Sequence, residues 1–249
     1  MNVLVTGGGT IAPIDDVRQI TNVSTGGFSA AITEACLQRG ATVWHLCPRS
    51  AQRPFARHAR FDLETSDAAA EQERLARLLA AWREVRERFH PILLEDGTVA
   101  EYRDRLEETL RGQAIHIAFL AMAVSDYEPV PTPGKIESEA EILSILCRRT
   151  PKVIRFVRDW APAIYLVGFK LLSRASEETL IREARSACQQ NRADLTVAND
   201  LQTLRAGRHT IHLVRPGHPP ETIGPGGAIA ERLVERVFTW AAERRGPRP

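Results

Sequence analysis

The chain has 249 residues, of which 43% are hydrophobic and 26% are charged. It can therefore bury a sizeable core, and its composition excludes wholesale disorder. Lys and Arg number 33 and Asp and Glu number 31, so the formal net charge is only +2. This balance argues against a protein that coats a nucleic acid, but it allows a local basic pocket for a small phosphorylated ligand.

The sequence also lacks several features that would indicate a membrane or an oxidising compartment. No run of about 18 apolar residues is present, so we expect no membrane span. The first residues, MNVLVTGGGT, have neither the basic region nor the apolar core of a signal peptide. Four scattered cysteines without C-x-x-C spacing argue against a disulfide framework and against a zinc site. These observations predict a protein of the reduced cytoplasm.

Short apolar runs alternate with longer helical patterns along the chain. Strands are predicted at Asn2–Thr6, Thr42–Cys47, Ile115–Ala121, Ile164–Phe169, Asp194–Ala198 and Thr210–Val214. Helices are predicted at Thr25–Arg39, Asp67–Phe89, Val99–Arg111, Glu139–Cys147, Pro151–Trp160, Glu177–Gln190 and Ala228–Glu243. The alternation predicts an α/β fold with a doubly wound, Rossmann-like and mainly parallel sheet that carries helices on both faces. We expect residues 1–249 to form a single domain that binds ligands at the carboxyl ends of its strands.

Three segments carry expectations of their own. The charged stretch Ala68–Phe89 has apolar residues at helical spacing, which favours a surface helix packed by one face over a partner-binding device. Residues 207–227 are rich in Gly, Pro and His and predict a hairpin or an extended arm. Because exposed arms often pair, the segment near 200–227 is a candidate dimerisation arm. The last four residues, 246–249, are expected to fray.

A buried strand runs directly into three glycines in VLVTGGGTIAPID, residues 3–15. Glycine lets backbone amides approach an anion, so Gly8 and Gly9 are candidate phosphate contacts. The turn also fits the loose dinucleotide pattern G-x-G-x-x-A. However, Pro13 interrupts the expected pyrophosphate helix, and the second strand ends in LCPRS without an acidic residue for a ribose. A tight turn without a ligand is the alternative.

The next motif, DVRQITNVSTGGFSAAI at residues 16–32, leads into a helix. Ser24 or Thr25 is expected to cap this helix. Gly26 and Gly27 leave its first turn open, so its N–H groups and dipole can hold a phosphate. Asn22 lies just before the helix, where its amide can bond a carbonyl or a carboxylate. A loop Asn that satisfies its own backbone is the alternative.

Two further residues follow the third predicted strand. Asp126 lies at the strand end in FLAMAVSDYEPV and could hold Mg²⁺, a ribose or a base. It could equally be a capping Asp. Lys135 lies in the Gly/Pro loop TPGKIES, which suits a mobile lid whose ammonium follows charge developing on an oxygen. A solvated surface lysine is the alternative.

The remaining candidates lie near later strands. Lys152 in TPKVI falls in a first helical turn, within possible reach of a phosphate. In VGFKLL, Phe169 could stack on a nucleobase and Lys170 could contact phosphate, with core packing as the equal alternative for Phe169. VANDL, residues 197–201, adds amides and a carboxylate expected at the same rim. Together these residues suit a polyphosphate and a second anion.

The ordered motif set resembles the phosphopantothenate–cysteine ligase family. It comprises LVTGGGT, PID, VR, ITN and STG, followed by AVSDY, KI, PK, VGFK and AND, and it runs from residue 3 to about residue 214. The resemblance implies amide formation between (R)-4′-phosphopantothenate and L-cysteine in coenzyme A biosynthesis. A nucleoside triphosphate would first convert the carboxylate into an acyl-nucleotide, with release of pyrophosphate, and the cysteine amine would then displace the nucleoside monophosphate.

The resemblance also implies roles for particular residues. Asn22 and Lys135 would be catalytic, and the phosphopantothenate would be bound by Asn22, Ser24, Thr25 and Gly26. The nucleotide would be bound by Gly8, Gly9, Ala123, Asp126, Lys135, Lys152, Val153, Ile154, Phe169 and Lys170. Mg²⁺ would accompany the triphosphate, with Asp126 as a candidate ligand. The resemblance implies a homodimer, and it does not imply a flavin.

The nucleotide preference is left open by departures from the family pattern. Members fused to a decarboxylase have lysines before AND, whereas SACQQNRAD offers only Arg192 here. Lys170 and DWAP, residues 159–162, resemble the stand-alone type instead. CTP is favoured, with ATP as the alternative. A non-catalytic nucleotide-binding module and a nicotinamide-dependent reductase are the competing hypotheses.

Overall fold

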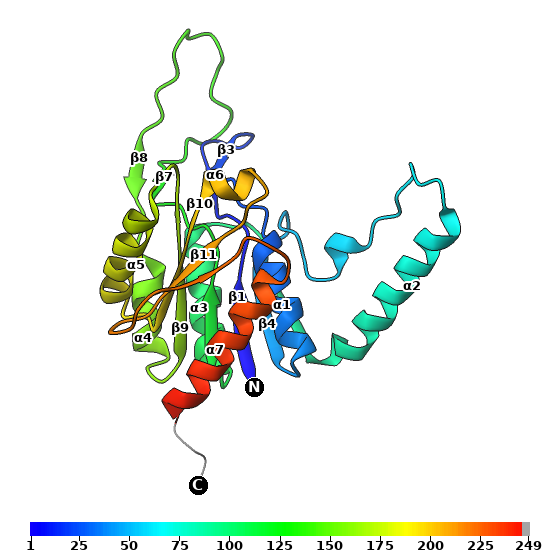
Figure 1. Ribbon diagram of the computed structural model, residues 1–249. Coiled ribbons are helices and arrows are strands. Elements are labelled where there is room, and N and C mark those ends of the chain that lie inside the picture. Colours follow the sequence, from blue (N-terminus) through cyan, green and yellow to red (C-terminus); the bar gives the residue numbers. More distant parts are fainter. Residues whose placement is uncertain (246–249) are drawn as a thin grey trace.

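The computed structural model describes residues 1–245, so the tail 246–249, expected to fray, lies outside it. Six parallel strands form most of one central sheet: β1 (Asn2–Thr6), β4 (Thr42–Pro48), β5 (Phe89–Leu94), β6 (Ile117–Leu120), β9 (Tyr165–Leu172) and β10 (Leu195–Asp200). Two antiparallel strands, β11 (Ile211–Val214) and β12 (Glu221–Ile223), complete one edge. The order across the sheet is β12-β11-β10-β9-β6-β1-β4-β5. Helices lie around this sheet (Figure 1), which confirms the predicted α/β class.

Successive side chains of the parallel strands alternate between two buried faces. In β1, Val3 and Val5 belong to one hydrophobic cluster and Leu4 to another. The first face is covered by α1 (Gly27–Gln38) and α7 (Ile229–Arg245), and the second by α3 (Val99–Gly112), α4 (Val157–Trp160) and α5 (Glu177–Asn191). No helix within residues 1–245 combines the length and the apolar character needed to cross a membrane.

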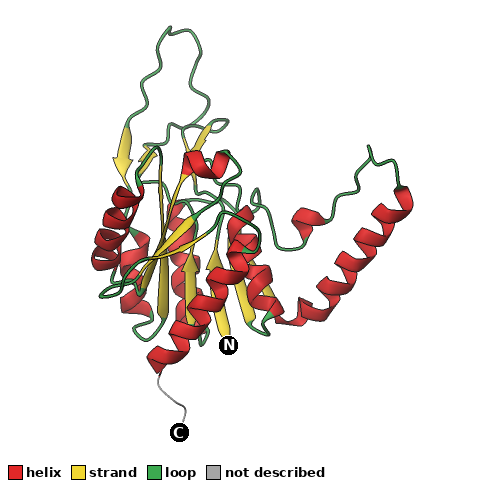
Figure 2. Cartoon of the chain, in the orientation of Figure 1, coloured by secondary structure: helices red, strands yellow, loops and turns green. Residues whose placement is uncertain are grey.

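Two small antiparallel ribbons stand at the carboxyl ends of the parallel strands. One joins β2 (Ile11–Pro13) to β3 (Gln19–Thr21), and the other joins β7 (Tyr127–Pro129) to β8 (Cys147–Arg149). Figure 2 shows the long loop between β7 and β8 rising above the sheet. The same view shows α2 (Ala68–Val85) leaning away from the rest of the molecule. The ribbons extend the sheet edge at which ligands were expected.

The helix predicted at Glu139–Cys147 is wrong, because residues 139–146 form no helix and β8 begins at Cys147. Every residue of this stretch is exposed, so no apolar face is buried against the sheet. A nine-residue helix is too short to be stable in water without such packing, since isolated helices need about 12–15 residues. The stretch instead forms most of the projecting loop.

Other boundaries differ from the predicted ones for local reasons. The helix expected to reach Phe89 ends at Val85, and residues 89–94 form the unpredicted strand β5. Pro91 lies within β5, where it is tolerated because β5 is an edge strand. Pro151–Trp160 is not one helix but a 3₁₀ turn at Val153–Phe156 followed by α4.

The segment near 200–227 was expected to form a hairpin or an extended arm, and it forms a hairpin. It contains α6 (Leu201–Arg205), β11 and β12, and β11 pairs with β10 of its own sheet. The hairpin therefore extends the central sheet of the same chain. A role of this segment in dimerisation stays a prediction.

Candidate active site

The glycine turn after β1 and the segment after β6 lie side by side. Gly9 forms a parallel bridge with Ala123. The Thr10 N–H donates to the Ala123 carbonyl at 3.1 Å, and the Ala123 N–H donates to the Gly8 carbonyl at 2.9 Å. Two motifs that are far apart in sequence thus form one backbone surface at the carboxyl edge of the sheet.

Asn22 is fixed to this same surface. Its Nδ2 donates a hydrogen bond to the Ala123 carbonyl oxygen at 2.9 Å. The alternative, in which Asn22 satisfies only its own loop, is therefore wrong. A primary amide has two N–H donors and an oxygen acceptor, so this bond leaves Asn22 the capacity to donate to a ligand carboxylate. The side chain is half-buried, which allows such a contact.

The start of α1 closes against the glycine turn. Its N-cap is Gly26, with a left-handed φ of 78°, and no side chain caps the helix. The expected cap by Ser24 or Thr25 is wrong by one to two residues, although the Thr25 hydroxyl accepts from the Gly27 N–H at 3.3 Å. A Cβ on Gly26 would lie 3.3 Å from the Gly8 nitrogen. The two glycine turns therefore meet, and an uncapped helix N-terminus, with no acidic residue in its first turn, lies beside them.

The glycines of the first turn are also required by packing. Gly8 has a φ of 83°, and a Cβ there would lie 2.9 Å from both Ala51 and Pro48. At Gly9, a Cβ would lie 2.9 Å from the Asn22 carbonyl oxygen. The tight-turn interpretation is thus correct for the fold, and it is compatible with anion binding by the same amides.

Asp126 and Lys152, both candidate nucleotide contacts, form an ion pair between Oδ1 and Nζ. The Thr150 N–H adds a bond to the Asp126 carbonyl at 3.0 Å. Within residues 1–245 no group of three or more His, Cys, Asp or Glu side chains is placed to hold a metal ion. The Lys152 pair occupies Oδ1 of Asp126, and both side chains are exposed, so a role of Asp126 toward Mg²⁺ stays a prediction.

Val153 and Ile154 contribute packing by their side chains. Val153 is buried in the core, and the Ile154 Cδ1 lies 3.2 Å from where a Cβ on Gly168 would stand. Any nucleotide contact of the buried Val153 would come from its backbone, whereas the side chain of Ile154 is only partly buried. Phe169, in β9, packs edge-to-face on Phe28 with ring centroids 6.2 Å apart and is only half-buried. Core packing and an exposed stacking face are therefore both available to it, and Lys170 follows it in the same strand.

The loop that carries Lys135 is attached to the segment before β3. The Thr132 N–H donates to the Ile14 carbonyl at 2.9 Å, and the Asp16 N–H donates to the Gly134 carbonyl at 3.1 Å. Lys135 itself is exposed. The segment that carries Lys135 is therefore attached beside the site, and its movement as a lid stays a prediction.

The carboxylate expected at the rim has a structural role, and Arg192, the cation that precedes AND, lies elsewhere. The Asp200 carboxylate accepts backbone N–H bonds from Ala175, Gln202 and Thr203 at 2.9–3.2 Å, and so caps α6. These bonds lower the pKa of Asp200, and the bond from the Ala175 N–H has the largest effect. Arg192 lies before β10, at the opposite edge, and pairs with Asp159 at 2.8 Å.

Hydroxyl residues next to the motifs were missed as site residues. The Thr10 hydroxyl accepts from the Ser125 N–H at 3.0 Å, and the Thr21 hydroxyl donates to the Thr10 carbonyl at 3.0 Å. The Thr150 hydroxyl donates to the Ser125 carbonyl. The sequence could have indicated these threonines by their position, because they directly flank the glycines, the Asn and the Pro-Lys of the quoted motifs. Together they join the turns that the motifs form.

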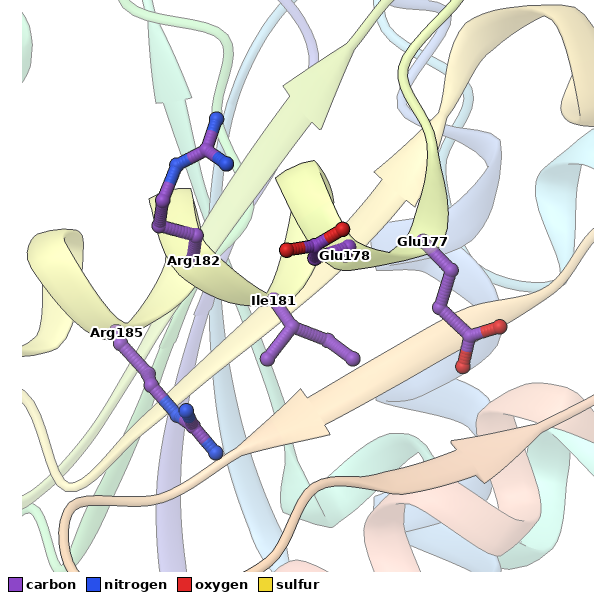
Figure 3. Close-up of a pocket in the computed structure, with 5 residues that line it drawn as sticks. All are labelled: Glu177, Glu178, Ile181, Arg182 and Arg185. Atoms are coloured by element: carbon purple, nitrogen blue, oxygen red, sulfur yellow. The ribbon is translucent and has the colours of Figure 1, made fainter.

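A surface cavity of about 610 Å³ lies away from these residues, over the first turns of α5. Figure 3 shows its lining residues, Glu177, Glu178, Ile181, Arg182 and Arg185. None of them belongs to a predicted motif. The candidate site is thus identified by the convergence of motif residues at one sheet edge.

Known proteins match the chain along most of its length. The sequence profile described as DNA/pantothenate metabolism flavoprotein C-terminal domain matches residues 1–80 and 93–239. Phosphopantothenate–cysteine ligase 2 of Oryza sativa is 32% identical, over 80% of this chain and 68% of its own length. The human phosphopantothenate–cysteine ligase is 31% identical, over 81% of this chain and 72% of its own length. The chain spans only 44% of the bifunctional coenzyme A biosynthesis protein CoaBC of Thermococcus kodakarensis, at 30% identity.

Solved structures agree with this assignment. The DNA/pantothenate metabolism flavoprotein from Streptococcus pneumoniae superimposes with a TM-score of 0.76 at 28% identity, over 96% of this chain and 99% of its own. A Cab2 variant in complex with phosphopantothenate-cysteine shares the fold, with a TM-score of 0.84 at 22% identity over 98% and 87% of the two chains. The chain therefore belongs to the DNA/pantothenate metabolism flavoprotein C-terminal domain family and, within it, to the phosphopantothenate–cysteine ligases.

Proposed function

We propose that this chain joins 4′-phosphopantothenate and L-cysteine in a reaction driven by a nucleoside triphosphate. One observation carries the proposal: Asn22 donates to the Ala123 carbonyl, which also accepts from Thr10. This bond brings the glycine turn, the ITN motif and the AVSDY motif to one point. The related ligases support the chemistry, because their named substrates are the ones that these motifs imply.

The reaction has two steps in this proposal. The pantothenate carboxylate attacks the α-phosphorus of the triphosphate, an acyl-nucleotide forms, and pyrophosphate leaves. The cysteine amine then attacks the acyl carbon, the amide forms, the nucleoside monophosphate leaves and the amine loses a proton. Activation is needed because a free carboxylate is a poor electrophile, whereas a mixed anhydride has a good leaving group.

The chain's own groups would offset the charge of two anionic substrates. Amides of the Gly8–Gly9 turn and the uncapped start of α1 would bind phosphate oxygens. Asn22 would hold the reacting carboxylate through its second amide N–H, and Ser24, Thr25 and Gly26 would line that subsite. Lys135 would stabilise negative charge that develops on an oxygen in the transition state. Positioning of the reactants by these groups would supply much of the rate.

The nucleotide would lie between the glycine turn and β9. The half-buried ring of Phe169 offers a face for a base, while Lys152 and Lys170 offer ammonium groups for phosphates. Stacking on an aromatic ring tolerates any base, so it does not choose between CTP and ATP, and we favour CTP. Mg²⁺ would enter bound to the triphosphate, as part of that substrate.

The decisive experiment mixes the pure protein with phosphopantothenate, cysteine, Mg²⁺ and either CTP or ATP. We expect pyrophosphate release together with the coupled amide, identified by mass spectrometry. Without cysteine, pyrophosphate should appear only in amounts close to that of the enzyme, because the acyl-nucleotide stays bound. Absence of pyrophosphate with both triphosphates, or binding of NADPH instead, would refute the proposal.

Assembly as a homodimer belongs to the same proposal. Sedimentation equilibrium of the full chain, with and without the triphosphate, measures it directly. A monomer at concentrations where the enzyme is fully active would contradict it.

A further inference from the structure

A buried carboxylate lies directly beneath the loop that carries Lys135. The Asp15 side chain is fully buried, with an exposed fraction of 0%. Its Oδ1 accepts N–H bonds from Val17 at 3.0 Å and from Arg18 at 2.7 Å, which closes a local turn. Its Oδ2 accepts from the guanidinium of Arg18 at 2.5–2.9 Å. A buried carboxylate needs such compensation because burial alone disfavours its charge.

The side chains of Asp15 and Arg18 also bond the backbone N–H and the backbone carbonyl of Ile136, which is distant in sequence. Asp15 Oδ2 also accepts the Ile136 N–H at 3.0 Å. The Arg18 guanidinium donates to the Ile136 carbonyl at 2.6 Å. These are charge-assisted hydrogen bonds, which are stronger than neutral ones. We call this arrangement the Asp15–Arg18 clamp.

The clamp fixes the residue that immediately follows Lys135. On the other side of Lys135, the Gly134 carbonyl accepts from the Asp16 N–H at 3.1 Å. Lys135 therefore lies between two anchored neighbours, although its own side chain is exposed. Only its side-chain torsions are left free, so the clamp limits where its ammonium can reach. Because Asp15 and Arg18 neutralise each other, they add no net charge beside that ammonium.

We propose that Asp15 and Arg18 are positioning residues, which act on the reaction by holding the Lys135 segment in place. This inference rests on the proposed function, because it needs Lys135 to be catalytic. Geometry of this kind matters to rate: a misplacement of about 1 Å can cost roughly 100-fold in turnover. The clamp thus links the PID and VR motifs to the KI motif.

The first test measures the clamp without any substrate. Amide hydrogen exchange of residues 132–138, followed by mass spectrometry, is compared between the wild type, Arg18→Lys and Asp15→Asn. Lysine keeps the charge but lacks the fork that reaches both Asp15 and Ile136. Asparagine keeps the volume but turns an NH₂ group toward two donors. Both variants should exchange faster in this segment, and unchanged exchange would overturn the clamp.

A matched control exists in α2. The Arg74 guanidinium bonds the buried Glu71 carboxylate, three residues before it, and donates to the carbonyls of His58 and Arg60 at 2.6–3.0 Å. Arg74→Lys therefore removes the same kind of contact far from the site. It should alter exchange near residue 60, with no change at 132–138 and no change in turnover.

The second test is a double-mutant cycle between Arg18→Lys and Lys135→Gln. Single-turnover formation of the amide, with enzyme in excess, keeps slow variants measurable. Alone, Arg18→Lys should lower the single-turnover rate constant roughly 10- to 100-fold, while the KM values, measured in the steady state, stay near those of the wild type. In the Lys135→Gln background it should lower this rate constant no further. The same loss in both backgrounds, or no loss in either, would overturn the positioning role.

The two tests also separate failure of this inference from failure of the proposed function. An inactive wild-type protein would remove the proposed function and the catalytic half of the inference, while exchange at 132–138 would still decide whether the clamp holds the loop. An active wild type with multiplicative losses would remove only the positioning role.

Discussion

Two regions of this molecule are built in opposite ways. At the carboxyl edge of β1 and β6, short motifs bond one another across long stretches of sequence: Gly8, Thr10 and Asn22 all meet Ala123. In α2, the contacts are mostly local. Asp67 accepts from the Ala70 N–H at 2.9 Å, and Glu73 pairs with Arg77 one turn later. The family profile matches the motif edge and most of α2, and residues 81–92, which include the last turn of α2, are unmatched.

The difference shows what each region is for. A helix that is stabilised by its own cap and its own ion pairs can change sequence without changing a site. A loop edge whose turns are joined by bonds between distant residues cannot, because a substitution there removes a contact that no neighbour in sequence replaces. Mutations in the first region should therefore lower activity, whereas mutations in the second should change stability alone.

The largest effect is expected from Asn22→Asp. This change places a negative charge beside the anionic carboxylate of the substrate and removes the amide that donates to the Ala123 carbonyl. We expect kcat/KM for phosphopantothenate to fall roughly 100-fold or more, the scale of losing one such donor. Steady-state pyrophosphate release measures it. Asn191→Asp, at the far end of α5, is the isosteric control, and equal activity of the two variants would remove Asn22 from the site.

The next effect concerns pH and a buried histidine of the central sheet. His45, in β4, bonds the Thr33 hydroxyl at 2.7 Å, and its Nε2 has no hydrogen-bond partner among the described residues. Burial lowers the pKa of His45 from 6.5 to about 4, against a smaller opposing effect of Glu34. Between pH 6.5 and pH 4, His45 is protonated in the unfolded chain but neutral in the folded one. The free energy of unfolding is therefore greatest above pH 6.5 and falls as the pH drops. The loss should reach roughly 3 kcal/mol near pH 4.

Urea unfolding at several pH values between 6.5 and 4.5 checks this dependence. His45→Gln keeps a hydrogen-bonding side chain but does not titrate, so its stability should fall less steeply with decreasing pH. Burial also lowers the pKa of His209, which leaves a residual slope in that variant. Identical slopes in both proteins would show that His45 carries none of the dependence.

Sequence reasoning found the strands and the motif edge for one physical reason. Buried parallel strands are continuous apolar runs, as in NVLVT, and their carboxyl ends must share an edge. It failed at Glu139–Cys147, where helical propensity had no tertiary partner, and at β5, where Pro91 hid an edge strand. It placed Asn22 and Ala123 correctly at one edge but could not supply their bond, or the clamp of Asp15 on Ile136, because such pairings depend on three-dimensional register.

In the second region, Trp82→Ala should have the clearest effect on stability. Trp82 attaches α2 to the body, with its ring 5.5 Å from those of Phe55 and Phe89. Loss of this half-buried ring should cost about 2–3 kcal/mol, measured by denaturant unfolding. Turnover well below the melting temperature should match the wild type. Leu79→Ala, on the exposed side of α2, is the control, and a loss of turnover in Trp82→Ala would tie α2 to the site.

A glycine pair tests the motif edge by packing alone. Gly9→Ala places a Cβ 2.9 Å from the Asn22 carbonyl oxygen, whereas a Cβ on Gly112 meets nothing within 4 Å. We expect Gly9→Ala to cost about 1–2 kcal/mol of stability and to lower kcat. Gly112→Ala, at the end of α3, should be neutral or slightly stabilising. Equal thermal shifts for the two variants would show that the edge tolerates displacement of Asn22.

The smallest effect is expected from Arg77→Ala. Arg77 pairs with Glu73 on the exposed side of α2, and both side chains are about two-thirds exposed, at 66% and 69%. Water and salt screen such a pair, so its removal should change stability by at most about 0.5 kcal/mol. Alanine is also the best helix former, which offsets part of the loss. Denaturant unfolding at low and high salt measures both contributions. A loss above about 1 kcal/mol would mean that α2 depends on long-range order, as the motif edge does.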